Sequence, residues 1–153
     1  MSHPAPEDLP LSPSWKTWKI PNTTLSVVGY SRAADKTAFW IPELKWFLDA
    51  GSMASTTHRP ERVFLTHVHS DHSYNLPNLV SSRHQTDIYA PEESVKLVEN
   101  FIFASQYLNS HCSAETPGFH PPKMTIHPVK ENDSFTIGKK SEYTVRVVKV
   151  FFI

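Results

Sequence analysis

The segment Val63–Pro77, VFLTHVHSDHSYNLP, decides how this chain is to be understood, because it joins an apolar run to a cluster of metal-binding side chains. The histidines and the aspartate fall within six positions, at His67, His69, Asp71 and His72. In an extended chain, residues two apart point to the same side, so the first two histidines can share one site. A turn after them brings the aspartate and the last histidine round to an adjacent site.

The chemistry of this cluster indicates a metal-dependent hydrolase. Imidazole and carboxylate ligands suit zinc, and also manganese or iron. Four ligands this close in sequence cannot all face one tetrahedral ion without strain, so two ions about 3.5–4 Å apart are the more natural arrangement. Water bound to zinc has a pKa of about 7. Hydroxide is then available at neutral pH for attack on a phosphodiester, thioester, lactone or amide. The plainer alternative is a surface histidine cluster with only adventitious metal affinity.

The surrounding pattern predicts an α/β or α+β fold with a mixed sheet. Short runs of β-branched and aromatic residues between turn signals predict strands at 23–31, 37–41, 44–51, 62–67, 86–90, 124–129, 134–138 and 142–153. Short connections make the first three antiparallel neighbours, and the apolar strand 62–67 is expected to be buried on both faces. Helices are predicted at 75–83, with Asn75 as N-cap and Pro77 in the first turn, and at 91–109.

Length and composition limit the organisation and the compartment. A proline-rich, loose leader is expected at 1–20, followed by one domain at 21–153. The formal net charge is zero, which weakens bulk attraction to nucleic acid or membrane. The single cysteine, Cys112, excludes an intrachain disulfide framework and fits a reducing compartment. With no expected signal peptide or membrane span, a cytoplasmic or nuclear protein is the default.

Three stretches carry a resemblance to a known family. HVHSDH after an apolar strand resembles the HxHxDH signature of the metallo-β-lactamase superfamily, FLDAG resembles the family's preceding strand, and ENDSFTIG resembles the segment leading into its second half. Within that superfamily, LTHVHSDHSYNLPNL is most similar to the ribonuclease Z (tRNase Z) branch. The resemblance covers about residues 25–150 and corresponds to roughly the first half of the family's fold.

The resemblance implies the N-terminal part of an αββα sandwich that holds two zinc ions at the sheet edge. By this resemblance His67 and His69 would bind the first ion, and Asp71 and His72 the second. Asp71 would also be the catalytic proton acceptor for the attacking water. Asp49 matches the aspartate that supports the ligands without touching the metal, although a simple turn or capping role explains it equally well.

This chain departs from the family pattern at several positions. The family uses a further histidine for the first zinc ion, a bridging aspartate, and a last histidine for the second ion. Where the first of these would follow, the sequence reads VFFI. We do not expect the remaining histidines to replace it, namely His84, His111, His120 and His127. Tyr74 and Asn75 stand where glycines are common in the ribonuclease Z branch, so an altered helix entry is expected.

The carboxyl-terminal sequence predicts an incomplete domain. The β-prone run YTVRVVKVFFI would expose an apolar strand, which is an aggregation hazard. Half a sandwich also leaves one inner face without its partner sheet. At roughly 25 cal/mol per Å², several hundred Å² of exposed apolar surface costs several kcal/mol, against a typical domain stability of about 5–15 kcal/mol. We therefore expect truncation, with either homodimerisation or support from a missing C-terminal half.

Three functions follow from these observations. The leading hypothesis is a ribonuclease Z-like endonuclease that cuts precursor tRNA at its 3′ end. Candidate contacts to the RNA backbone are Arg32, Lys36, Arg59, Arg62 and Arg83, each of which is otherwise ordinary surface charge. The second hypothesis is a hydrolase of the same fold acting on a small thioester or lactone, since one fold hosts many reactions. The third is a catalytically inactive metal-binding fragment, motivated by the missing ligands.

Overall fold

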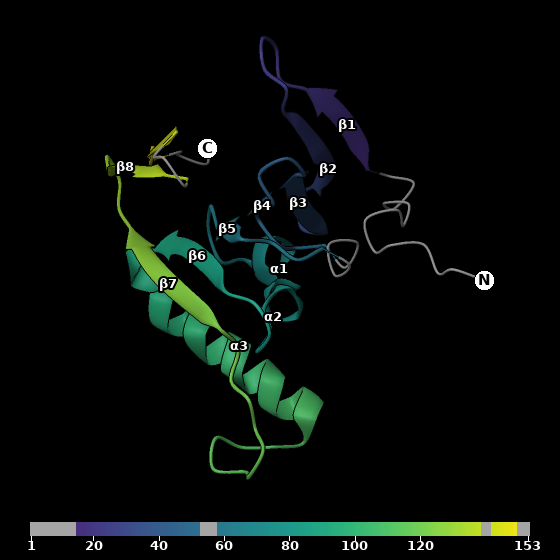
Figure 1. Ribbon diagram of the computed structural model, residues 1–153, viewed down its shortest axis with the longest axis vertical. Helices are drawn as coiled ribbons and strands as arrows, with labels where there is room; N and C mark the ends of the chain where they lie inside the picture. The colour runs from purple at the N-terminus through teal and green to yellow at the C-terminus, as the bar shows by residue number, and fades with distance from the viewer. Residues whose placement is uncertain (1–14, 53–57, 139–141, 150–153) are drawn as a thin grey trace, which may run out of the picture.

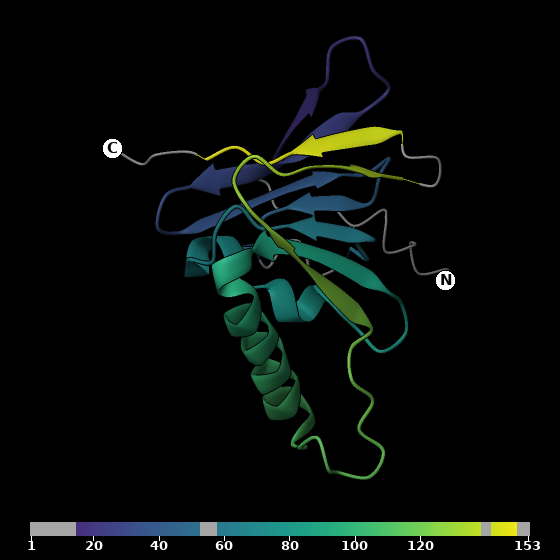
Figure 2. The same ribbon diagram turned by 90° about the vertical axis from the view of Figure 1, so that its left-hand side faces the viewer.

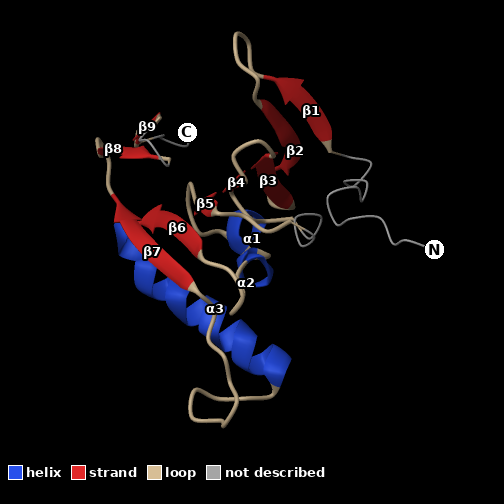
Figure 3. Cartoon of the chain, in the orientation of Figure 1, coloured by secondary structure: helices blue, strands red, loops and turns tan. Residues whose placement is uncertain are grey.

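The computed structural model describes residues 15–52, 58–138 and 142–149, and shows a seven-stranded sheet with helices along it (Figures 1 and 3). In order across the sheet, the strands are β1 Lys16–Lys19, β2 Ser26–Arg32, β3 Lys36–Ile41, β4 Trp46–Leu48, β5 Arg62–Phe64, β6 Thr86–Pro91 and β7 Met124–Val129. A separate two-stranded sheet consists of β8 Ser134–Ile137 and β9 Tyr143–Arg146.

The sheet changes from antiparallel to parallel at β4. Strands β1 to β4 pair antiparallel because short turns connect them, whereas β4 to β7 pair parallel. Helices provide the parallel crossovers. The short helices α1 Ser70–Ser73 and α2 Leu76–Leu79 lie between β5 and β6, and a 3₁₀ turn, Glu92–Ser94, followed by α3 Val95–Ser110 lies between β6 and β7. The carboxyl ends of β5 and β6 therefore lead into helices at one edge of the sheet.

The helices cover one face of the sheet and bury its main core. Side chains from β3, β4, β5 and β6 meet α2 and α3 there; the fully buried members include Phe47, Val63, Leu76, Leu79, Ile88 and Ile102. On α3, Val98 and Ile102 point into this core, as the helical spacing predicts. Leu108, near the end of the same helix, is 76% exposed. The distal half of α3 projects beyond the sheet, as Figure 2 shows, so that residue has no sheet to pack against.

The β8–β9 hairpin covers part of the opposite face (Figure 2). Its Phe135 stacks on Tyr89 of β6 at 5.1 Å between ring centroids, and Tyr89 stacks on Phe64 of β5 at 4.7 Å. Toward the β1 edge the same face carries Trp18, which contacts Phe39 and is 47% exposed. The hairpin therefore forms the start of a second layer over β4 to β6.

The predicted α/β class with a mixed sheet is confirmed. The strands predicted at 37–41, 86–90, 124–129 and 134–138 match β3, β6, β7 and β8 closely. The antiparallel pairing predicted for the first three strands is also correct. The long helix is confirmed as α3, although Pro91 belongs to the end of β6.

Other boundaries were predicted wrongly. Strand β1 was not predicted and falls inside the expected leader 1–20, of which residues 1–14 lie outside the described part. The strand predicted at 62–67 stops at Phe64. It was expected to be buried on both faces, but only Val63 is buried, while Arg62 and Phe64 are half-buried. The strand predicted at 142–153 is reduced to β9, and 150–153 lie outside the described residues. Asn75 is the N-cap as predicted, but α2 ends at Leu79 because the next residue has extended backbone.

Among the residues that the structure describes, no helix combines the length and apolar character needed to cross a bilayer.

The buried face of α3 is expected to carry much of the stability of this region. Replacing Ile102 with alanine leaves a cavity against the sheet and is expected to lower the free energy of unfolding by about 2–5 kcal/mol. Leu108→Ala, on the projecting half of the same helix, is the matched control and is expected to change it by less than about 0.5 kcal/mol. Urea unfolding followed by circular dichroism measures both; equal losses would contradict the described packing.

Candidate metal and catalytic site

The histidine cluster lies at the carboxyl end of β5, where the chain turns into α1. His69 is the residue that caps α1, and the helix lasts a single turn. Backbone hydrogen bonds tie this turn to the segment after β4: the Ala50 N–H donates to the His72 carbonyl at 2.6 Å, and the Asn75 N–H donates to the Ala50 carbonyl at 2.8 Å. Main-chain hydrogen bonds from the segment after β4 therefore hold the cluster in place.

The structure gathers the four predicted ligands. The His67 ring lies 4.7 Å from that of His69 and 3.9 Å from that of His72, measured between centroids. Asp71 Oδ2 lies 3.5 Å from His72 Nε2. Within the described ranges, however, no group of three or more histidine, cysteine, aspartate or glutamate side chains is arranged to hold a metal ion. The metal-binding role of these residues therefore stays a prediction.

Asp49 lies directly behind the cluster and is only 3% exposed. It occupies the left-handed region with φ of 60°, a conformation that aspartate tolerates better than most residues and that turns the chain off β4. Its Oδ2 lies 2.8 Å from His72 Nδ1, and its Oδ1 accepts the Thr66 N–H at 2.8 Å. The Thr66 hydroxyl also donates to this carboxylate. This placement is the one expected for an aspartate that supports a ligand.

Asp71 has a backbone partner that no local sequence pattern predicts. The Ala34 N–H, in the turn between β2 and β3, donates to Asp71 Oδ2 at 3.1 Å. Ala34 has φ of 57°, so the turn adopts a left-handed residue that presents this N–H to the carboxylate. The contact joins residues 37 positions apart, and it places the β2–β3 turn beside the cluster.

The surroundings of His67 favour its neutral form. Burial lowers the pKa of His67 below its usual value, and the neighbouring His72 lowers it further, while Asp49 partly opposes this change. Because a histidine must be deprotonated on one nitrogen to bind a metal ion, a lowered pKa suits a ligand. The donor set of three imidazoles and one carboxylate fits zinc by its chemistry. We therefore retain zinc as the group that these residues suit.

The other histidines lie elsewhere and have separate contacts. His84 Nδ1 lies 2.7 Å from the Ser81 hydroxyl, and His127 pairs with Asp87 at 3.3 Å on the opposite face of the sheet. His111 ends α3 with φ of 52°, and His120 is exposed in the following loop. The structure brings none of these four to the cluster.

Two of the five basic residues proposed to contact RNA lie near the cluster. Arg32 and Lys36 flank the turn that contacts Asp71, and Arg32 forms an exposed ion pair with Asp35. Arg62 begins β5, at the end of that strand away from the histidines, and lies over the Trp46 ring. The Arg59 guanidinium donates to the His58 carbonyl in the loop before β5, and Arg83 is exposed after α2.

Asn75, at the helix entry where the resemblance leads one to expect glycine, has a structural role. Asn75 is fully buried, and its amide donates to the Ser52 carbonyl at 2.9 Å while its Oδ1 accepts from Asn78. Tyr74, beside it, is 58% exposed. Asn75 thus links α1 and α2 to the segment after β4 through a satisfied buried amide.

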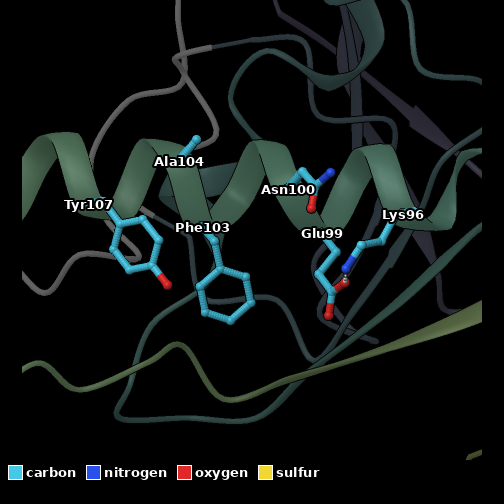
Figure 4. A pocket seen from close by; sticks show the side chains of 6 residues that line it. All are labelled: Lys96, Glu99, Asn100, Phe103, Ala104 and Tyr107. Carbon is cyan, nitrogen blue, oxygen red and sulfur yellow. Dashed lines mark hydrogen bonds and ion pairs between the residues drawn. The ribbon is translucent and has the colours of Figure 1, made fainter. Parts of the chain in front are cut away.

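A hollow of about 490 Å³ lies on the outer side of α3, away from the histidine cluster. Figure 4 shows the six lining side chains, which all come from this helix: Lys96, Glu99, Asn100, Phe103, Ala104 and Tyr107. Lys96 and Glu99 pair with each other across it at 2.6 Å. None of the predicted ligands lines this hollow, so the candidate site rests on the clustered donor groups and not on the concave surface.

The chain is similar in sequence to known proteins. The family model described as "Beta-lactamase superfamily domain" matches residues 39–150. The chain is 32% identical over 121 residues to the ribonuclease Z of Streptococcus suis (strain 98HAH33), covering 67% of this chain and 38% of that protein. It is 31% identical over 115 residues to the ribonuclease Z of Enterococcus faecalis (strain ATCC 700802 / V583), covering 66% of this chain and 33% of that protein. The chain therefore spans between a third and two fifths of the length of these relatives.

Gly51 is expected to be required for the close approach of α1. A Cβ at this position would overlap the carbonyl oxygen of Asp71, which is a backbone atom and cannot rotate away. We expect Gly51→Ala to lower the free energy of unfolding by about 1–3 kcal/mol through overpacking and to weaken zinc binding by displacing Asp71. Gly118→Ala is the control: its Cβ meets no atom, so it is expected to cost only about 1–2 kcal/mol for its left-handed backbone. Zinc titration calorimetry showing equal affinities for the two variants would contradict this.

The buried surroundings of His84 are expected to make stability depend on pH. Burial lowers the pKa of His84, and nearby Arg59 lowers it further. The unfolded chain, with a histidine pKa of about 6.5, then binds a proton before the folded chain does. Stability is therefore lost as the pH falls below about 6.5. We expect His84→Gln to flatten this loss in urea midpoints measured across that range, whereas His120→Gln, at an exposed position, should preserve it.

Proposed function

The chain belongs to the beta-lactamase superfamily, and from this premise we propose that it is a ribonuclease Z-like, metal-dependent hydrolase acting on the 3′ end of precursor tRNA. One observation carries the proposal. His67, His69, Asp71 and His72 gather at the carboxyl end of a parallel strand, with a buried carboxylate behind them. The identity to proteins named ribonuclease Z supports the choice of reaction.

The residues that would hold zinc are His67 and His69 for one ion, and Asp71 and His72 for the other. When bound, such ions lower the pKa of a bound water and offset the negative charge of a phosphodiester. Asp49 supports His72 from the side away from solvent, through the 2.8 Å contact between its carboxylate and Nδ1. A carboxylate in this position fixes the ring orientation of a ligand and raises its basicity.

Asp71 is assigned as the group that accepts the proton of the attacking water. Its carboxylate is held at one oxygen by the Ala34 N–H, which limits its rotation. A positioned carboxylate acting as general base contributes about 10²–10⁴-fold to the rate.

The substrate contacts nearest to this group come from the β2–β3 turn. Arg32 and Lys36 flank Ala34, and the Arg32 side chain is 71% exposed. Their cationic groups are available to phosphate oxygens of an RNA strand that places its scissile phosphate at the cluster. Phosphate contacts of this kind orient the strand and carry no sequence information.

Asp71→Ala is expected to lower the rate of precursor-tRNA cleavage by the zinc-loaded chain about 10²–10⁴-fold, which removes detectable activity. RNA affinity should remain largely unchanged. The matched control is Asp87→Ala, which removes a carboxylate from β6 that pairs with His127 outside the cluster. Gel-based cleavage assays and filter binding measure the two effects. Unchanged turnover in the Asp71 variant would refute its assigned role.

The same assays separate the alternative functions. Hydrolysis of a generic thioester or lactone without RNA cleavage would favour a small-molecule hydrolase of this fold. Zinc binding without either activity would favour a catalytically inactive metal-binding fragment, which the short span relative to the relatives makes relevant. Removal of zinc by a chelator is expected to abolish activity in the first two cases.

A further inference from the structure

The hydroxyl of Thr66 lies between the buried carboxylate and the first predicted ligand. Thr66 Oγ1 is 3.0 Å from Asp49 Oδ1, 2.9 Å from Asp49 Oδ2 and 3.1 Å from His67 Nδ1. We propose that Thr66 is a positioning residue that fixes the tautomer of His67 and so keeps its lone pair on Nε2 for a metal ion. The proposal rests on the zinc site of the proposed function and adds a residue to its support.

The number of protons that the hydroxyl, the carboxylate and the imidazole can donate determines the direction of each hydrogen bond. A hydroxyl group has one proton to donate, and an ionised carboxylate is an acceptor only. The Thr66 proton therefore goes to Asp49, and Oγ1 can serve His67 only as an acceptor. His67 must then carry its proton on Nδ1. In a neutral imidazole with its proton on Nδ1, the lone pair is on Nε2.

Asp49 also fixes the tautomer of His72, and it does so by direct contact without the Thr66 hydroxyl between them. Its Nδ1 lies 2.8 Å from Asp49 Oδ2, so it donates to the carboxylate directly and also keeps its lone pair on Nε2. Asp49 thus acts on two predicted ligands, on His72 by direct contact and on His67 through the Thr66 hydroxyl. One buried carboxylate sets both tautomers, and the conformational freedom of both rings is reduced before any metal ion binds.

The position allows the hydroxyl to be removed without releasing the carboxylate. The Thr66 N–H donates to Asp49 Oδ1 at 2.8 Å, and this backbone bond does not depend on the side chain. Thr66 is also exposed overall, so its side chain contributes little to the packed core. Thr66→Val preserves shape and β-branching; it removes the hydroxyl contacts to Asp49 and His67 and a longer 3.4 Å approach to His72 Nδ1, and it leaves the direct contact between Asp49 and His72 in place.

The test uses the whole zinc-free chain and then zinc ion alone. Long-range proton–nitrogen NMR spectra of the zinc-free protein report which ring nitrogen carries the proton. We expect the Nδ1–H form for His67 and His72 in the wild type, and loss of that form for His67 only in Thr66→Val. Competition with a chromophoric chelator should show zinc affinity falling about 10–100-fold in this variant. Thr66→Ser keeps the hydroxyl and should restore both properties.

Thr125→Val is the matched control, since it removes a threonine hydroxyl that contacts Gln85 away from the cluster. It should leave both the His67 tautomer and the zinc affinity unchanged, and urea unfolding confirms that each variant is folded. A wild-type His67 with its proton on Nε2 would overturn the proposal, as would a Thr66→Val protein with unchanged zinc affinity. Neither readout involves RNA, so a zinc-loaded wild type that fails to cleave RNA would refute the proposed function and leave this positioning role intact.

Discussion

The buried carboxylate of Asp49 is the constraint on which the arrangement of the site depends. A carboxylate that is 3% exposed loses most of its hydration, and an uncompensated buried charge costs several kcal/mol. The structure compensates it with donors from Thr66 and His72, which both belong to the segment after β5. These contacts hold that segment against the end of β4. The place of the histidines follows from the electrostatic requirement of this one group.

The rigidity of the site comes from tertiary contacts and not from local helix stability. A helix of four residues is far too short to be stable alone, because nucleation fixes several residues for one hydrogen bond. Here the Ala50 N–H and carbonyl hold α1 from both sides, and the buried amide of Asn75 anchors its exit. Gly51 allows the two backbones to approach closely, since any side chain there would overlap Asp71. The cluster is thus attached to the sheet by main-chain bonds that do not depend on a bound metal ion.

The sequence predicted most of the sheet because its strands carry strong β-branched and aromatic patterns. It missed β1, whose four residues are all exposed and so lack the alternation that burial imposes. The helix α1 was also missed, because a single turn is too short for helical periodicity to be visible. At the site, local spacing was enough to identify the histidines. The contact of Ala34 with Asp71 joins distant positions, and no local pattern encodes such a pair.

The charges around the cluster bear on which substrate fits it. Sites for small ligands enclose most of the ligand in a concave and largely apolar surface. In this chain His69 is exposed and His67 is half-buried, while the side chains of Asp71 and His72 are 14% and 18% exposed; Arg32 and Lys36 flank the neighbouring β2–β3 turn. A polymer needs only that its backbone reach the reacting groups, because contacts elsewhere along the strand supply its binding energy. The two cations beside the cluster fit the phosphodiester of the proposed RNA substrate, because phosphate contacts need positive charge and hydrogen-bond donors and not an enclosing apolar pocket.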